Sequence, residues 1–173
     1  VYKRQLLMCD SLHMASTKKP PIYYGLAQVY VTMRDFEQCD YYYNLAGESY
    51  DNMLPYEKYI YLNNRGTSYY YREDYQTAIK YFQKVIDLVE GYDDMSFELN
   101  LGRLNLGDCY LQLNMVDLAV KYINECQLFF EEMGVSTALY YIDTQKIELA
   151  LLQKDFQEAR RLLSESVVPP GID

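Results

Sequence analysis

The sequence predicts an all-α fold, a right-handed superhelical solenoid built from antiparallel helix hairpins. Three observations support this fold class. A pattern of small and bulky residues returns at intervals near 40 residues, an Asp–aromatic pair introduces the second helix of most repeats, and helix-breaking residues separate the expected helices. Half of the 173 residues are hydrophobic, so the chain can bury a core and is not expected to be disordered.

Each repeat contains an anchor position that is usually small, followed by a Tyr-like residue three positions later, a small residue at +12 and a bulky residue at +16. Gly66, Tyr69, Ala78 and Phe82 fit this pattern best. The anchors lie at positions 27, 66, 107 and 147, so successive spacings are 39, 41 and 40 residues. The fourth repeat fits weakly, because Ile147 replaces the small anchor. Small residues let two helices approach closely, and stacked hairpins bury faces that one hairpin leaves exposed.

Local signals place the helices. Asp35, Asp74 and Asp155 stand just before a second helix, where a carboxylate accepts the unpaired N–H bonds of the first turn; the third repeat has Met115 there instead. With a truncated leading helix from an earlier repeat, the pattern predicts about four hairpins. The expected helices are 6–16, 21–33, 36–50, 55–72, 75–90, 96–113, 116–132, 136–153 and 156–167.

Proline and glycine mark the expected helix boundaries. Pro55 suits the first position of a helix, since its missing N–H would have no helical partner there. Gly91 and Gly134 suit helix ends, where the chain often adopts a left-handed conformation. The pair Pro169-Pro170 is expected to end the last helix.

The predicted domain organisation is one repeat domain over residues 6–168. Within it, 6–19 is interpreted as the remnant of an earlier repeat, and the repeats are 20–54, 55–95, 96–135 and 136–168. Residues 169–173 are interpreted as the start of a truncated continuation. The opening Val1-Tyr2-Lys3-Arg4-Gln5 is similar to a translated sequencing-adapter end, so residues 1–5 are interpreted as a non-native scar.

The segment from Gly66 to Phe82 resembles the tetratricopeptide repeat family most clearly, and the resemblance covers about residues 20–168. Two features depart from that family. The period is near 40 residues rather than about 34, and the aromatic residue expected before the anchor is present as Tyr23 only in the first repeat. HEAT-like repeats, which share the longer period, are the alternative fold. The long, Tyr-rich repeats are similar in style to those of regulators from gut Bacteroidota.

The resemblance implies a module that binds a protein or peptide partner in a concave groove lined by the first helix of each hairpin. Positions −3, +1, +4 and +5 from each anchor share this face. The alternative is that single residues of this face pack against neighbouring helices. The predicted binding residues are Tyr24, Gln28, Val31, Asn63, Thr67, Tyr70, Tyr71, Leu104, Asp108, Leu111, Thr144 and Glu148.

Within this face, the Asn63 amide could both donate to and accept from a peptide backbone, and Tyr70 and Tyr71 could be anchors, because Tyr is frequent at binding hot spots. The positions selected include no Lys or Arg and do include Asp108 and Glu148. A clamp for a chaperone's carboxylate tail is therefore not expected.

Composition and motifs argue against other function classes. With 16 Lys and Arg against 25 Asp and Glu, the net charge is −9, and no basic stripe suited to nucleic acid is present. No apolar run reaches the length of about 18 residues that a membrane helix needs. The four cysteines lack metal-site spacing and are interpreted as buried structural thiols. We therefore expect no enzyme activity, cofactor, metal, nucleic-acid binding or membrane insertion.

A second functional hypothesis is a sensory or regulatory input region of a larger bacterial signalling or transcription-regulating protein. Contact of the groove with flanking regions of its own protein, rather than with a separate partner, is a further alternative. The sequence indicates a soluble segment, cytoplasmic or periplasmic, and does not identify the ligand.

Overall fold

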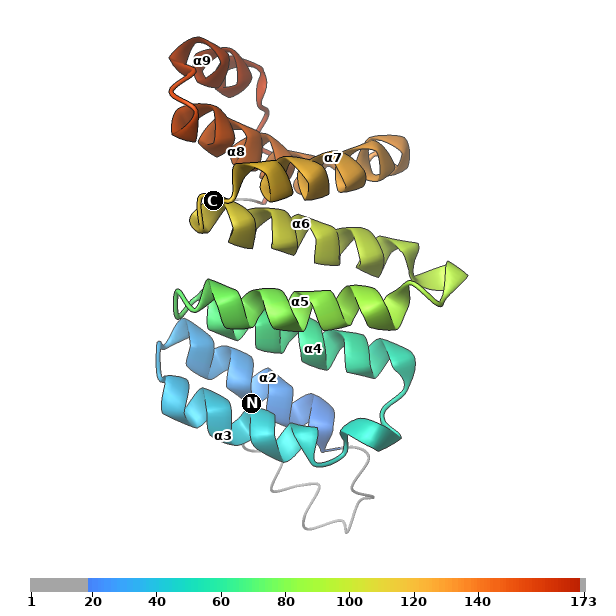
Figure 1. The fold of residues 1–173 in the computed structure, drawn as a ribbon. Helices are drawn as coiled ribbons and strands as arrows, with labels where there is room; N and C mark the ends of the chain where they lie inside the picture. Colours follow the sequence, from blue (N-terminus) through green and yellow to red (C-terminus); the bar gives the residue numbers. More distant parts are fainter. Residues whose placement is uncertain (1–18, 172–173) are drawn as a thin grey trace. The chain divides into compact units, whose positions relative to one another are not determined.

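The computed structural model describes residues 19–171, and this part of the chain is all α-helical, with no β-strand (Figure 1). The predicted scar at 1–5 and the predicted leading helix at 6–16 lie outside the described residues. The helices are α2 (Pro20–Thr32), α3 (Phe36–Gly47), α4 (Pro55–Tyr70), α5 (Tyr75–Val89), α6 (Ser96–Gln112), α7 (Val116–Met133), α8 (Ser136–Leu152) and α9 (Phe156–Glu165). The predicted all-α repeat fold is thereby confirmed.

The helices group into two compact units. The first unit extends to Gly91 and holds the hairpins α2–α3 and α4–α5, while the second begins at Tyr92 and holds α6–α7 and α8–α9. In the first unit, α4 packs against both α2 and α3. In the second unit, α8 packs against both α6 and α7. Each unit is thus a stack of two hairpins.

Close helix approach depends on the predicted small residues. A methyl group at Gly66 would lie 2.7 Å from the Phe82 ring, closer than packed carbon atoms allow. At Gly107 the same methyl group would lie 3.1 Å from the Ile123 side chain. In the fourth repeat the larger Ile147 occupies this position and stays half-buried. The weak fit of that repeat therefore corresponds to a real difference in packing.

The predicted N-caps are confirmed. The carboxylate oxygens of Asp35, Asp74 and Asp155 accept backbone N–H bonds from residues three positions later, at 3.2, 3.1 and 3.0 Å. Met115 occupies the N-cap position of α7 and makes no side-chain hydrogen bond there, as expected from the absence of Asp at this position of the third repeat. Three of the four second helices are therefore started by the same local interaction.

The four hairpin turns contain a feature that the sequence analysis did not identify. Arg34, Glu73, Asn114 and Lys154 adopt left-handed backbone conformations, with φ of 55, 64, 56 and 60°. Each lies seven residues after its repeat anchor. In the first turn, the Asp35 N–H donates back to the Tyr30 carbonyl at 3.0 Å, and the other three turns repeat this bond. Side chains disfavour this conformation, which glycine adopts freely.

Most of the described helices end one to three residues earlier than predicted. Residues 48–50 do not continue α3, and the short 3₁₀ turns η2 (Tyr50–Asn52) and η3 (Asp93–Met95) precede α4 and α6. Gly134, with a φ of 65°, caps the end of α7, and Gly91 directly follows the cap residue of α5, so both glycines lie at helix ends as predicted. The last helix ends at Glu165 because the backbone becomes extended at Ser166, before the two prolines.

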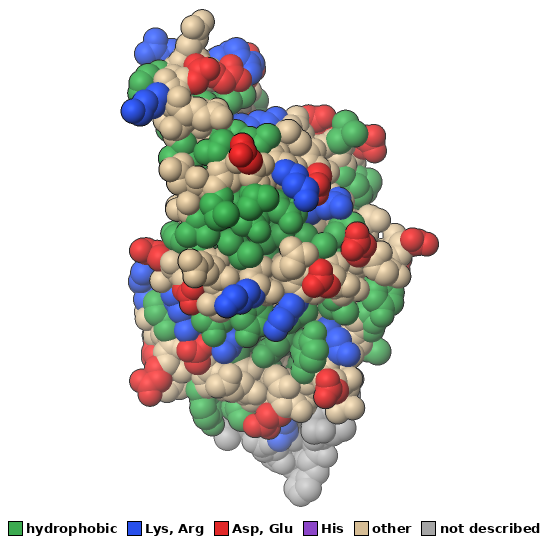
Figure 2. Space-filling model, in the orientation of Figure 1, with side chains coloured by type: hydrophobic (Ala, Val, Ile, Leu, Met, Phe, Trp, Pro, Cys, Tyr) green, Lys and Arg blue, Asp and Glu red, His purple; other side chains and the backbone are tan. Residues whose placement is uncertain are grey.

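Two surface properties bear on function. On the face shown in Figure 2, acidic and basic side chains are interspersed rather than gathered into a stripe of one sign. Within residues 19–171, no helix combines the length and the apolar character that crossing a membrane requires.

Candidate functional site

The first helices of the first two hairpins, α2 and α4, form a line of hollows between them. We call this surface the α2–α4 trough. Its largest hollow has a volume of about 550 Å³, and an adjoining hollow of about 410 Å³ shares Gln28 and Thr32 with it. The larger hollow is lined by Gln28, Val31, Thr32, Arg34, Thr67 and Tyr71. Four of the predicted binding residues, Gln28, Val31, Thr67 and Tyr71, therefore meet at one hollow.

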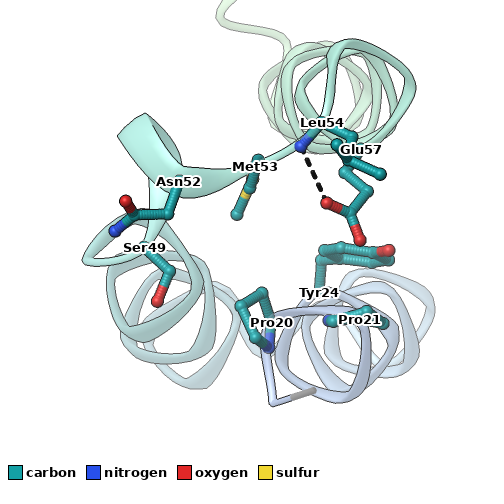
Figure 3. Close-up of a pocket in the computed structure, with 8 residues that line it drawn as sticks. All are labelled: Pro20, Pro21, Tyr24, Ser49, Asn52, Met53, Leu54 and Glu57. Atoms are coloured by element: carbon teal, nitrogen blue, oxygen red, sulfur yellow. Dashed lines mark hydrogen bonds between the residues drawn. The ribbon is translucent and has the colours of Figure 1, made fainter. Parts of the chain in front are cut away.

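Tyr24 lines a further hollow, of about 300 Å³, at the beginning of α2 and α4 (Figure 3). Met53 points into this hollow, which the turn before α4 closes on one side. The remaining lining residues are Pro20, Pro21, Ser49, Asn52, Leu54 and Glu57. Two prolines, a tyrosine and a methionine around a few polar groups make this hollow suited to an apolar side chain with a polar neighbour.

Glu57 makes this end of the trough acidic. One of its carboxylate oxygens accepts the backbone N–H of Leu54 at 2.9 Å, which fixes the first turn of α4. Its carboxylate also lies beside the Tyr24 side chain (Figure 3). Burial, followed by the negative charge of Glu57, raises the pKa of the Tyr24 phenol, so this hydroxyl stays protonated and can donate a hydrogen bond.

On α4, the predicted residues divide between open surface and internal packing. The Thr67 hydroxyl donates to the Asn63 carbonyl oxygen at 3.0 Å. The Tyr70 ring makes edge contacts with Tyr71 and Tyr75, at centroid distances of 5.9 and 5.4 Å. Tyr71 is 53% exposed and lines the largest hollow. Of the two predicted tyrosine anchors, Tyr71 is the one on open surface at the trough.

Arg34 is a trough residue that sequence reasoning missed. It lies two residues after α2, in the left-handed turn position, so the helical periodicity used to select the face did not include it. Its side chain lines the largest hollow together with Thr67 and Tyr71. The sequence signal that could have identified Arg34 is its place in the repeat, because it lies in the turn between the two helices of a hairpin.

In the second unit, two predicted residues belong to the core instead of an open surface. Leu104 is 6% exposed and Leu111 is 2% exposed, and both pack in the cluster that contains Ile123, Phe130 and Ile142. The buried Gln145 side chain donates to the Leu104 carbonyl oxygen at 2.9 Å and thereby joins α8 to α6. These two leucines stabilise the hairpin stack, which is the packing role that the sequence analysis kept as the alternative.

The other predicted residues of the second unit are Asp108 on α6 and Thr144 and Glu148 on α8, and we call this set the acidic seam. Glu148 accepts a hydrogen bond from the Gln112 amide at 3.0 Å across the two helices. Asp108 is half-buried on α6, and the exposed Thr144 hydroxyl donates to the Tyr140 carbonyl at 2.9 Å. The first-helix surfaces of the two units therefore differ in charge.

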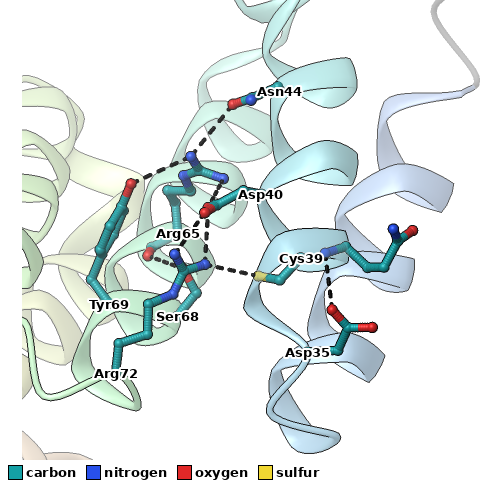
Figure 4. A network of polar contacts seen from close by, with 9 residues as sticks. Asp35, Cys39, Asp40, Asn44, Arg65, Ser68, Tyr69 and Arg72 are labelled. Carbon is teal, nitrogen blue, oxygen red and sulfur yellow. Dashed lines mark hydrogen bonds and ion pairs between the residues drawn. The ribbon is translucent and has the colours of Figure 1, made fainter.

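A polar network outside the predicted site joins α3 to α4 (Figure 4). Both oxygens of Asp40 accept hydrogen bonds from Arg72, at 2.7 and 2.9 Å. The same carboxylate pairs with Arg65 at 3.2 Å. Arg65 also donates to Asn44 and to the Tyr69 hydroxyl, each at 3.4 Å. One carboxylate thus connects two arginines that come from the following hairpin.

Aromatic rings enclose these arginines. The Arg65 guanidinium lies 4.9 Å from the Tyr43 ring centroid, and that of Arg72 lies 4.8 Å from the Phe36 centroid. Arg65 is only 6% exposed. Such contacts stabilise a desolvated cation. The network is therefore a joint between consecutive hairpins, and sequence reasoning missed it because its members are far apart in the chain.

Three of the four predicted structural thiols are described, and they are buried: Cys39, Cys109 and Cys126. Burial raises the pKa of Cys109 to about 12 and that of Cys126 to about 12, so both remain protonated at neutral pH. Within the described residues, no group of three or more His, Cys, Asp or Glu side chains is arranged to hold a metal ion.

Comparison with known proteins gives matches to one repeat family. Residues 59–92 and residues 102–128 match the tetratricopeptide repeat family. The chain is 27% identical over 136 residues to the anaphase-promoting complex subunit CDC16 of Saccharomyces cerevisiae. That similarity covers 76% of this chain and 15% of the yeast protein. No solved structure matches the chain significantly.

The two family matches fall on α4–α5 and α6–α7, which are also the hairpins whose glycine anchors need close helix contact. Proteins built from such repeats typically act as non-catalytic scaffolds for other proteins. The recurring pattern, the stacked hairpins and the family matches together show that this chain contains tetratricopeptide repeats.

Proposed function

We propose that this chain binds an extended segment of a partner protein in the α2–α4 trough. The observation that carries the proposal is the line of adjoining hollows between α2 and α4, with Gln28, Val31, Thr67 and Tyr71 around the largest. A hollow of about 550 Å³ has the size of a ligand site. Its lining combines amide, hydroxyl and phenol groups with apolar surface.

The chemistry of the lining favours a peptide over a small charged metabolite. The Gln28 amide both donates and accepts, so it can pair with peptide N–H and C=O groups. Tyr71 offers a large exposed ring with a polar tip, and tyrosine loses little conformational entropy on binding. The yeast relative is, by its name, a subunit of a protein complex, which supports a role in protein interaction for this chain also.

The acidic seam of the second unit is a separate part of the proposal. Asp108, Thr144 and Glu148 would contact polar or basic groups of a partner, while Leu104 and Leu111 would contribute through the packing of the unit. In the first unit, Tyr24, Asn63 and Tyr70 would shape the trough around the direct contacts of Gln28, Val31, Thr67 and Tyr71. The hypothesis of a bacterial signalling input region stays a prediction.

The test is selection of binding peptides by the full chain from a phage-displayed library of random peptides. The trough variant carries Gln28→Ala and Tyr71→Ala. Its matched control carries Gln76→Ala and Tyr41→Ala, which removes the same two residue types from the second helices. Tyr41 is 54% exposed and Tyr71 is 53% exposed, so truncation at either position removes little buried area. Melting curves of both variants verify the fold.

The proposal would be supported if the wild-type chain and the control enrich the same peptides and the trough variant does not. Synthetic copies of these peptides should bind the wild-type chain in calorimetry with a stoichiometry of one. Enrichment that survives in the trough variant would contradict the assignment of the trough. Failure of the wild-type chain to enrich any peptide would contradict peptide binding itself.

A further inference from the structure

We propose that the Arg34 end of the α2–α4 trough binds an acidic side chain of the partner peptide. This inference rests on the proposed function. It adds which side chains the bound peptide carries and in which direction the peptide lies. The partner is a segment of protein that carries an Asp or Glu at one end of the contact and an apolar side chain at the other.

Arg34 supplies an available positive charge at the largest hollow. Its guanidinium lies over the Phe36 ring, 5.8 Å from the centroid. Among residues 19–171 it forms no ion pair with a carboxylate, whereas Arg65 and Arg72 of the same unit both pair with Asp40. An exposed arginine beside a hollow presents several N–H donors in a plane, which match the two oxygens of a carboxylate.

Neutral donors surround the same position. Gln28, Thr67 and Tyr71 line the hollow with Arg34, and none of them carries a charge at neutral pH. The closest acidic side chains in sequence are Asp35, which caps α3, and Glu37 in the first turn of α3, and neither lines the hollow. Glu73, which occupies the next turn, does not line it either. A peptide carboxylate in this hollow would therefore meet one cation and several hydrogen-bond donors.

The opposite end of the trough has the reverse character. Tyr24, Met53 and the two prolines form a largely apolar hollow there, and Glu57 adds a negative charge. A peptide carboxylate would be repelled by Glu57 and an apolar side chain would be favoured. This difference between the two ends sets the direction in which the peptide lies.

The length of the trough sets the spacing. Ten residues along a helix separate Tyr24 from Arg34, which corresponds to a distance of about 15 Å. An extended peptide advances by about 3.3 Å per residue, so about four or five residues span this distance. The expected motif is an apolar residue separated by that interval from Asp or Glu.

A peptide is favoured over nucleic acid as the source of the negative charge. A phosphate backbone needs several clustered cations, and the chain as a whole carries a net charge of −9. Single-stranded nucleic acid remains one arm of the test. A fluorescent oligothymidylate probe should show no binding to the full chain, and binding of that probe with dependence on Arg34 would contradict the peptide assignment.

The decisive experiment repeats the peptide selection with the Arg34→Glu variant. Its matched control is Lys154→Glu, which makes the same charge change at the equivalent left-handed turn position of the second unit. Peptides selected by the wild-type chain should contain the acidic residue at a fixed distance from an apolar one. Their affinity should fall about tenfold with Arg34→Glu and stay unchanged with Lys154→Glu.

Charge exchange gives a second measurement. A selected peptide whose acidic residue is replaced by Lys should bind Arg34→Glu better than it binds the wild-type chain, and both effects should weaken as salt concentration rises. Selected peptides without a conserved acidic position, or with equal affinity for Arg34→Glu, would overturn this inference while leaving trough binding intact. An absence of selected peptides would overturn both proposals.

Discussion

The two units stack their hairpins with the same repeat frame but with different interior chemistry. Both place a stacked tyrosine pair at equivalent positions, Tyr69–Tyr81 in the first unit and Tyr110–Tyr122 in the second, with centroids 5.4 and 5.6 Å apart. In the first unit, the joint between hairpins is the ionic network around Asp40. In the second unit, the corresponding joint is the aliphatic and aromatic cluster around Ile123 and Phe130.

This difference shows that the repeat pattern determines helix pairing but leaves the chemistry between hairpins free to vary. An apolar joint gains free energy from burial and depends little on salt or pH. A joint of buried arginines depends on keeping its carboxylate, because an unpaired buried charge is costly. The two units should therefore respond differently to changes in charge, which the following predictions test.

The largest expected effect is loss of the Asp40 carboxylate. Asp40→Asn leaves Arg65 and Arg72 without their negative partner, although the Asp40 side chain is itself 38% exposed and solvent offsets part of the loss. We expect the free energy of unfolding to fall by about 2 kcal/mol, between the values for exposed and buried ion pairs. Urea unfolding followed by circular dichroism measures this change.

The matched variant in the second unit is Glu125→Gln. Glu125 pairs with Arg103 at 3.4 Å, and the two side chains are 36% and 26% exposed. Because this pair is more solvated and is not part of the apolar joint, we expect a change of about 0.5 kcal/mol or less. Equal losses in the two variants would show that the Asp40 network is no more important than an ordinary surface pair.

The next effect concerns alkaline pH and the buried thiols of the second unit. Cys109 and Cys126 have pKa values raised to about 12 by burial, whereas an unfolded thiol ionises near pH 8.5. Above that pH the unfolded chain loses protons that the folded chain retains, so stability falls as pH rises toward 12. Each thiol should contribute about 1 kcal/mol of this loss by about pH 9.

Comparison of the wild-type chain with Cys109→Ala and Cys126→Ala measures that contribution. The double variant should lose less stability than the wild-type chain between neutral and alkaline pH, after its lower starting stability has been subtracted. Parallel pH profiles would indicate that the thiols ionise equally in the folded and unfolded chains. Tyrosine ionisation affects both proteins alike and cancels in the difference.

The smallest expected effect lies in the hairpin turns, which both units share. Glu73→Gly and Lys154→Gly should each stabilise the chain by about 0.5 kcal/mol, since relief of left-handed strain exceeds the entropy cost of glycine. Asn114→Gly is the control and should change stability little, because asparagine tolerates this conformation. Thermal unfolding would contradict the account if Asn114→Gly stabilised the chain as much as the other two variants.

The fold was accessible from sequence because its signals are local. The anchor glycines, the aspartate caps and Pro55 act on residues within one hairpin, so a repeating pattern reveals them without tertiary information. The sequence specified the helix ends less sharply than the helices themselves. For example, α3 ends earlier than predicted because the 3₁₀ turn at Tyr50–Asn52 leads into α4. The left-handed turns were missed because none of their four residues is glycine.

The candidate site was only partly accessible from sequence. Periodicity placed Gln28, Val31, Thr67 and Tyr71 on one face, and the structure brings these four together at one hollow. The same periodicity selected Leu104 and Leu111, which are buried against α7 and α8. A helical face contains both groove and core positions, and the boundary between them depends on the crossing of neighbouring helices.

By itself, the sequence determined that this chain forms helix hairpins of the tetratricopeptide type, where each second helix begins and which positions must be small. Those properties follow from backbone capping and close helix contact within about 40 residues of chain. Tertiary structure alone decided that Asp40 joins Arg72, 32 residues away, and that Arg34 faces the trough. Such contacts depend on how successive hairpins stack, and no local pattern records that geometry.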